Sequence, residues 1–318
     1  VGPVPDTQNL LRAARAELQR VRLATRTAPL TLHAVDGQGH SDFVGDIKAA
    51  LADGSIAPWF QPIVDAHTGA VTAFEALVRW VHPARGNIPP AEFLAHAEIA
   101  GFGQRLTHLV MERSIRFVRD MMSHDPDHVP AVHINVWPSD LRRPRFVDAL
   151  RQQLAIHGVP GDRVVLEITE SDIILLDDML HTSLRRISAM GVHLAIDDFG
   201  TGYSSLSHLV ELPVDHLKID RSFIAGITTS PKQDPLVCAV ISIATGLDLS
   251  VVAEGVETAE QVARLREMGC GQLQGYFVSA ALPQHEALTF TTDLARFREV
   301  DSLASVKPAL VGAASEPV

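Results

Sequence analysis

Cysteine is scarce in this chain, and long apolar stretches are missing. The 318 residues include two cysteines, Cys238 and Cys270. Two cysteines are too few for a disulfide framework, which favours a reducing, cytoplasmic compartment, and we expect both to pack as small buried hydrophobic side chains. No stretch of about 18 uncharged apolar residues occurs, so the sequence predicts no membrane span in this chain.

Positive charge is also in short supply. The chain has 27 Lys and Arg against 38 Asp and Glu, which gives a formal net charge of −11. This balance argues against a general nucleic-acid-binding surface, because such surfaces are basic. It does not argue against a phosphate substrate, since bound metal ions would reverse the local field.

The two ends of the chain differ from its centre. The chain starts with Val and has no signal peptide, which suggests a piece of a longer protein with an upstream sensory or signalling domain. Apolar residues at helical spacing predict a linker or signalling helix in residues 1–40, with a frayed end as the alternative. Residues 301–318 are rich in Ala, Ser, Val and Pro, and we expect a disordered tail. The folded domain should occupy residues 41–300.

Between these ends, apolar strand patterns alternate with helical patterns. Strands without polar alternation predict a parallel sheet covered by helices, and nearly eight repeats favour a TIM-barrel-like (β/α)8 fold over an open sheet. The first two strands are joined by too short a loop for a crossover helix, so they should form an irregular antiparallel hairpin. Strands are predicted at 58–64, 71–79, 131–136, 163–168, 192–197, 214–219, 249–254 and 271–275, and helices at 90–99, 104–123, 145–157, 178–190, 204–210, 235–247 and 259–268.

Acidic and amide side chains stand where these strands end. Burying a carboxylate at the end of a strand costs free energy, so its presence there suggests a functional role. The ends of parallel strands converge on one face of a barrel. An oxygen-rich cluster of this kind predicts a site for hard divalent cations. The residues are Glu75, Asn135, Glu167, Asp197, Asp198 and Glu254, and Lys218 and Gln274 end two further strands in the same way.

Seven segments in order resemble the EAL domain family of cyclic di-GMP phosphodiesterases. A lone Glu-Ala-Leu is common by chance, whereas seven such segments are very specific. They are FQPIV at 60–64, FEALVRW at 74–80, LEITE at 166–170, IDDFGTGYSS at 196–205, LKID at 217–220, VAEGVET at 252–258 and QGY at 274–276. The resemblance covers about residues 45–290, and no Gly-Gly-Asp/Glu-Glu-Phe segment for cyclic di-GMP synthesis occurs.

The resemblance implies hydrolysis of cyclic di-GMP to linear 5′-pGpG by water that two metal ions activate. Two divalent ions can neutralise both the attacking hydroxide and the leaving alkoxide of a phosphodiester. Mg²⁺ or Mn²⁺ would serve, and Ca²⁺ is expected to inhibit. By the same resemblance one ion is held by Glu75, Asn135, Glu167 and Asp197, and Asp197 bridges to a second ion near Asp198 and Glu254.

Adjacent Asp197 and Asp198 cannot both point inward from a regular strand, because successive side chains alternate. We therefore expect the strand to break there, with Gly200 and Gly202 just beyond supplying backbone freedom.

Lys218 is the unusual member of the set. Two divalent cations beside it would lower its pKa, so that it could orient or deprotonate the attacking water, with Glu254 as a second catalytic residue. The alternative is a lysine that only pairs with carboxylates. Asp220 is expected to support this loop and the substrate.

The remaining site residues follow from the resemblance. Gln61, Leu77, Arg79 and Gln274 would contact the substrate, although Arg79 could form a structural ion pair instead. Glu170 would hold the loop after Asp198 by hydrogen bonds, the alternative being an exposed glutamate at a helix start.

Several residues receive a plainer interpretation or depart from the family pattern. His133 and His193 should face the barrel interior as hydrogen-bonded core histidines, because they lack partners at zinc-ligand spacing. Trp137 replaces a small hydroxyl residue, and Ala280 and Ala281 replace an Arg-Pro pair, which puts substrate affinity in doubt.

Two functions from different classes are therefore weighed. The first is a cyclic di-GMP phosphodiesterase, and the alternative is a catalytically silent receptor for cyclic di-GMP. Such receptors usually lose metal ligands or the lysine, and none is missing here. The resemblance also implies a homodimer formed near the loop after Asp198.

Overall fold

The computed structural model describes residues 37–170, 177–200, 211–297 and 300. They fall into two compact units. The first contains the described residues up to Pro58 together with Val78–Val110, and the second contains Trp59–Leu77 and the described residues from Met111 onward. The limits predicted for the terminal segments stay predictions.

The first unit has its own aromatic core. It contains α2 (Gly37–Asp53), α3 (Pro90–Ile99) and β3 (Gly86–Ile88), which pairs in antiparallel fashion with the end of β2 (Val71–His82). Trp80 is 1% exposed and packs against Phe43 and Phe93 at ring-centroid distances of 5.3 and 5.5 Å. This unit therefore buries its apolar side chains around one tryptophan.

Eight strands close a ring in the described part of the chain, in the order β1-β9-β8-β7-β6-β5-β4-β2, with β2 pairing again with β1. β1 is antiparallel to β9, and each pair of neighbouring strands from β2 through β4, β5, β6, β7 and β8 to β9 is parallel. The predicted barrel and its irregular first hairpin are confirmed. The strands are β1 (Ile56–Asp65), β2, β4 (Ala131–Asn135), β5 (Val164–Thr169), β6 (His193–Phe199), β7 (His216–Ile219), β8 (Ser250–Ala253) and β9 (Gln272–Gln274).

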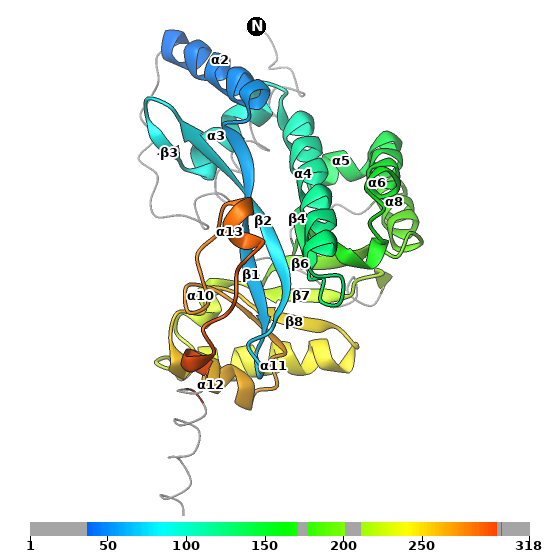
Figure 1. Cartoon of the computed structure of the whole chain (residues 1–318). Helices are drawn as coiled ribbons and strands as arrows, with labels where there is room; N and C mark the ends of the chain where they lie inside the picture. The colour runs from blue at the N-terminus through cyan, green and yellow to red at the C-terminus, as the bar shows by residue number, and fades with distance from the viewer. Residues whose placement is uncertain (1–36, 171–176, 201–210, 298–299, 301–318) are drawn as a thin grey trace, which may run out of the picture. The chain divides into compact units, whose positions relative to one another are not determined.

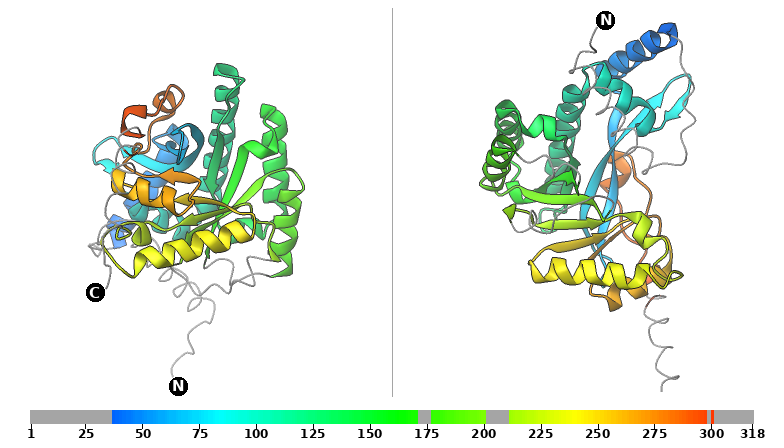
Figure 2. Two further views of the ribbon diagram at one scale, coloured as in Figure 1. Left: turned by 90° about the horizontal axis from the view of Figure 1, so that it is seen from below. Right: turned by 180° about the vertical axis from the view of Figure 1, so that it is seen from behind.

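Helices lie outside the barrel strands, where Figure 1 shows α6 and α8 side by side and Figure 2 shows α11 along the sheet. Apolar runs such as Val164 to Leu166 are buried because strands of a covered parallel sheet have no wet face. The helices are α4 (Gly103–His124), α5 (Pro138–Leu141), α6 (Pro144–His157), the 3-10 turn η1 (Gly161–Arg163), α8 (Asp178–Ser188), α10 (Arg221–Ile224), α11 (Gln233–Gly246), α12 (Ala259–Glu267) and α13 (Gln284–Ala287).

The expected helix at 204–210 lies outside the described residues. Within the described ranges, no helix combines the length and the apolar character needed to cross a membrane.

Candidate active site

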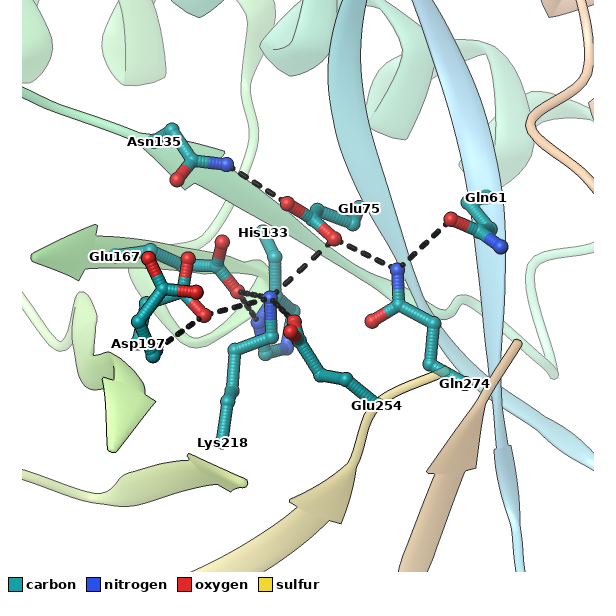
Figure 3. A network of polar contacts seen from close by, with 10 residues as sticks. Gln61, Glu75, His133, Asn135, Glu167, Asp197, Lys218, Glu254 and Gln274 are labelled. Carbon is teal, nitrogen blue, oxygen red and sulfur yellow. Dashed lines mark hydrogen bonds and ion pairs between the residues drawn. The ribbon is translucent and has the colours of Figure 1, made fainter. Parts of the chain in front are cut away.

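Four carboxylates and one lysine meet at the carboxyl ends of the barrel strands (Figure 3). Glu75, Glu167, Asp197 and Lys218 are each at most 2% exposed. They come from β2, β5, β6 and β7, and Glu254 directly follows β8. The convergence expected from the sequence is present because neighbouring parallel strands end at the same edge of the barrel.

Lys218 lies at the centre of this cluster. Its Nζ is 2.6 Å from Glu254 Oε1 and 2.8 Å from Glu167 Oε1. The same atom is 3.3 Å from Glu75 Oε2 and 3.6 Å from Asp197 Oδ1. One ammonium thus faces four carboxylates, and the cluster carries a surplus of negative charge.

The pKa shifts follow from this burial and charge. Burial alone would lower the pKa of Lys218, but the four carboxylates outweigh it and hold the pKa well above its usual value. Burial raises the pKa of Glu167, and Lys218 opposes that shift while Glu75 and Asp197 add to it. The lowered lysine pKa that we expected depends on bound cations and stays a prediction.

The expected strand break at Asp198 is not present, because β6 runs through Asp198 to Phe199, but the strand is irregular there. Asp198 has φ 55°, and the pairing of β6 with β7 shifts register between Ile196 and Phe199. The Asp198 backbone N–H donates to Asp197 Oδ1 at 2.9 Å. The irregularity lets two consecutive carboxylates serve one site.

The carboxylates form two groups that share Asp197. Glu75, Glu167 and Asp197 offer oxygen atoms that all lie within 4.8 Å of one another, and Asp197, Asp198 and Glu254 do the same. Oε2 of Glu167 is buried and has no hydrogen-bond partner, which is costly for a carboxylate oxygen unless something else binds it. The donor set and this orphaned oxygen fit hard divalent cations, which prefer oxygen ligands.

Two amide side chains surround Glu75. Asn135 Nδ2 donates to Glu75 Oε1 at 2.8 Å, and Gln274 Nε2 donates to Glu75 Oε2 at 2.6 Å. Gln274 Nε2 also reaches Gln61 Oε1 at 3.2 Å, and Gln61 Nε2 donates to the Ser279 carbonyl at 3.0 Å. Sequence reasoning missed that Gln274 holds Glu75.

The other predicted residues occupy different places. Asp220 is 9% exposed and caps α10, accepting from the Ser222 N–H at 2.9 Å. Glu170 Oε2 accepts from the Gly200 N–H at 2.8 Å, which is the type of contact that the predicted loop role requires, although residues 201–210 lie outside the description. Leu77 belongs to the barrel unit, whereas Arg79 belongs to the other unit and donates to the Val78 carbonyl at 3.0 Å. Their substrate roles stay predictions.

The two histidines differ in outcome. His133 is buried and hydrogen-bonded, as expected, and its partner is a predicted metal ligand, because Nδ1 lies 2.8 Å from Glu167 Oε1. His193 is not a core residue, since its side chain is 39% exposed and pairs with Asp215 at 3.1 Å. The contact between His133 and Glu167 could have been expected from strand geometry. Asn135 pairs with Glu167, and His133 lies two residues earlier on the same side of β4.

This fold and site define a class: a (β/α)8-type barrel with a cluster of carboxylates around one lysine at the carboxyl ends of its strands. The profile of the EAL domain matches residues 44–281, well over half of the sequence, so the chain belongs to the EAL domain family.

Two characterised relatives illustrate the family. The chain is 40% identical over 238 residues to the cyclic di-GMP phosphodiesterase NbdA of Pseudomonas aeruginosa, which covers 75% of this chain and 30% of NbdA. It is 36% identical over 240 residues to the oxygen sensor protein DosP of Escherichia coli, covering 76% of this chain and 30% of DosP. The chain therefore spans less than a third of the length of these relatives.

Solved structures show the same fold. The phosphodiesterase PaMucR in complex with c-di-GMP superimposes with a TM-score of 0.73 at 35% identity, covering 77% of this chain and 99% of that one. The EAL enzyme Bd1971 with cAMP and cyclic di-GMP bound gives a TM-score of 0.76 at 26% identity, with coverages of 89% and 74%. Phosphodiesterase activity is thus supported at the level of the family.

Proposed function

We propose that this chain hydrolyses cyclic di-GMP to linear 5′-pGpG with two Mg²⁺ or Mn²⁺ ions. The observation that carries the proposal is the pair of carboxylate groups sharing Asp197, with Lys218 among them. The named activity of NbdA and the c-di-GMP complex of PaMucR support the choice of substrate.

The two carboxylate groups that share Asp197 are the proposed ligands of the two ions. Glu75, Glu167 and Asp197, with Asn135 beside them, would hold one ion, and Asp197, Asp198 and Glu254 the other. When bound, two divalent ions supply positive charge that offsets the substrate phosphates and makes water more acidic.

Residues of the chain would transfer the protons that hydrolysis requires. Hydrolysis forms a bond from a water oxygen to phosphorus and breaks the bond to the 3′ oxygen, so one proton must leave the water and one must reach the 3′ oxygen. Among the carboxylates that pair with Lys218, Glu254 has the most accessible side chain, at 13% exposed. It is therefore best placed to accept the water's proton. Lys218, 2.6 Å away, would orient the water and give a proton to the 3′ oxygen, and Glu254 would then pass the water's proton to Lys218.

Substrate contacts are proposed for five residues, which are Gln61, Leu77, Arg79, Gln274 and Asp220. Gln61 and Gln274 already bond one another and their neighbours, so binding guanine or phosphate would exchange those hydrogen bonds for new ones. Such an exchange costs little when every polar group finds a partner again.

A silent receptor for cyclic di-GMP is the alternative. The test is to incubate the chain with cyclic di-GMP and Mn²⁺ and to separate the products by chromatography, with Glu167→Gln as a control of the same shape. We expect pGpG from the wild type and almost none from the control. Tight binding by both proteins without any pGpG would establish the receptor.

Three broader properties accompany this proposal. We expect a homodimer, to be checked by light scattering, and a cytoplasmic location. We also expect a sensory or signalling domain upstream in the intact protein, which the greater length of NbdA and DosP supports.

A further inference from the structure

A row of imidazoles leads from the buried carboxylate cluster to a partly exposed histidine. His133 on β4 bonds Glu167, and its ring packs against that of His216 on β7 at a centroid distance of 5.6 Å. His216 in turn packs edge-on against His193 on β6 at 5.7 Å, and His193 Nδ1 lies 3.1 Å from Asp215 Oδ1. His133 is the member of this row that touches a predicted metal ligand.

The bond from His133 divides the Glu167 carboxylate into two unlike oxygens. Oε1 lies 2.8 Å from His133 Nδ1 and 2.8 Å from Lys218 Nζ, so two protein nitrogens, one imidazole and one ammonium, lie against it. Oε2 is buried without any hydrogen-bond partner. A carboxylate whose one oxygen is occupied by two protein nitrogens offers its other oxygen to an ion.

His133 is suited to this task because an imidazole carrying one proton on Nδ1 can donate it to a carboxylate without adding a positive charge that would repel a cation. The His216 ring beside it restricts rotation of the donor.

We propose that His133 is a positioning residue for the divalent-ion site: its Nδ1–H anchors Oε1 of Glu167 and leaves Oε2 to bind the ion. The inference rests on the proposed function for the presence of the ion. His133 itself belongs to none of the seven family segments quoted above. The competing explanation is that His133 merely fills space in the barrel.

Three variants separate these explanations. His133→Leu keeps a side chain of similar breadth but removes the donor. His133→Asn keeps a donor, because an asparagine amide nitrogen can occupy the place of histidine Nδ1. His216→Leu changes the packing of the same row without removing a bond to a ligand.

The experiment measures the binding of Mn²⁺ in the absence of substrate. The electron paramagnetic resonance signal of the unbound ion gives the bound fraction, and circular dichroism checks that each variant is folded. We expect His133→Leu to weaken Mn²⁺ binding by about 10- to 100-fold, the usual effect of losing a hydrogen bond to a metal ligand. His133→Asn should bind nearly as tightly as the wild type, and His216→Leu should lose much less than His133→Leu. Turnover by His133→Leu should recover at high Mn²⁺.

Several results would overturn the assignment. They are unchanged Mn²⁺ binding in His133→Leu, equal weakening in His133→Asn, or equal weakening in His216→Leu. Should His133→Leu fail to fold, His133→Gln replaces it, since its amide reaches the position of Nε2 instead of Nδ1 and should weaken binding to the same extent. A wild type that binds Mn²⁺ without cleaving cyclic di-GMP would refute the proposed function alone, whereas one that binds no Mn²⁺ would refute this inference as well.

Discussion

Replacing Lys218 by methionine should destabilise the fold strongly, and divalent ions should reverse much of the loss. Methionine has a similar length and no charge, so the substitution removes the ammonium and keeps most of the packing. The side chain is 0% exposed, and no solvent can compensate for the missing charge.

The magnitude follows from the distances around Nζ. Four carboxylates lie 2.6 to 3.6 Å away, and each attraction is roughly 5 kcal/mol at an effective dielectric constant near 20. Desolvation of the ions cancels most of this sum, so the net loss should be about 3–5 kcal/mol, as for other buried ion pairs broken on one side. In a domain of this size that loss lowers the unfolding midpoint by roughly 10 °C.

Thermal unfolding in EDTA and in excess Mn²⁺ measures both parts of the prediction. Mn²⁺ at about 100 times its dissociation constant stabilises a folded protein by roughly 2.7 kcal/mol. The variant should gain more than the wild type, because its carboxylates repel one another without the lysine. Two controls fit this experiment: Lys48→Met changes an exposed lysine and should have little effect, and Lys218→Met/Glu254→Gln should recover stability by removing the nearest carboxylate.

The reasoning fails if Lys218→Met unfolds at the wild-type temperature in EDTA. It also fails if Mn²⁺ stabilises the wild type and the variant equally, because the ions would then not share the carboxylates with the lysine.

Further outcomes can be checked in the same preparation. Glu75→Ala should lower turnover by several orders of magnitude with an unchanged circular dichroism spectrum, and near-normal turnover would disprove the metal assignment. Chelation should abolish turnover and weaken cyclic di-GMP binding, Mg²⁺ or Mn²⁺ should restore both, and Ca²⁺ should restore binding better than turnover, as product analysis and calorimetry would show. Burial lowers the pKa of His216 from 6.5 to about 4. The free energy of unfolding should therefore be about 3 kcal/mol higher above pH 6.5 than at pH 4, because the unfolded chain binds a proton at His216 first as the pH falls. Urea unfolding of His216→Asn should show a flatter pH dependence. Burial raises the pKa of the Cys270 thiol to about 12, so iodoacetamide should label Cys238 and spare Cys270 in the native protein, as mass spectrometry can show.

Much of the fold could be predicted because its signals are local. Apolar runs without polar alternation identified the parallel strands, and the short loop after Asp65 identified the antiparallel hairpin. The irregularity of the strand at Asp198 followed from two adjacent carboxylates that a regular strand cannot aim at one site.

The remaining features depend on contacts between distant segments. The bond from Gln274 to Glu75 joins residues 199 positions apart, and that from His133 to Glu167 joins residues 34 positions apart. Strand alternation alone places His133 on the inner side of β4, but it does not reveal which oxygen of Glu167 lies against the imidazole ring. The sequence also did not predict that Val78–Val110 belongs to a separate compact unit, because β2 continues without a break from Glu75 to Trp80.

At Asp198 the left-handed backbone lowers stability, while the proposed metal-binding role requires the carboxylate at that position. A residue other than glycine at φ 55° costs about 1 kcal/mol, and glycine would relieve that strain while deleting a carboxylate of the second group. A library of random variants selected only for survival after heating should therefore accumulate glycine at position 198, and one selected for turnover should retain aspartate.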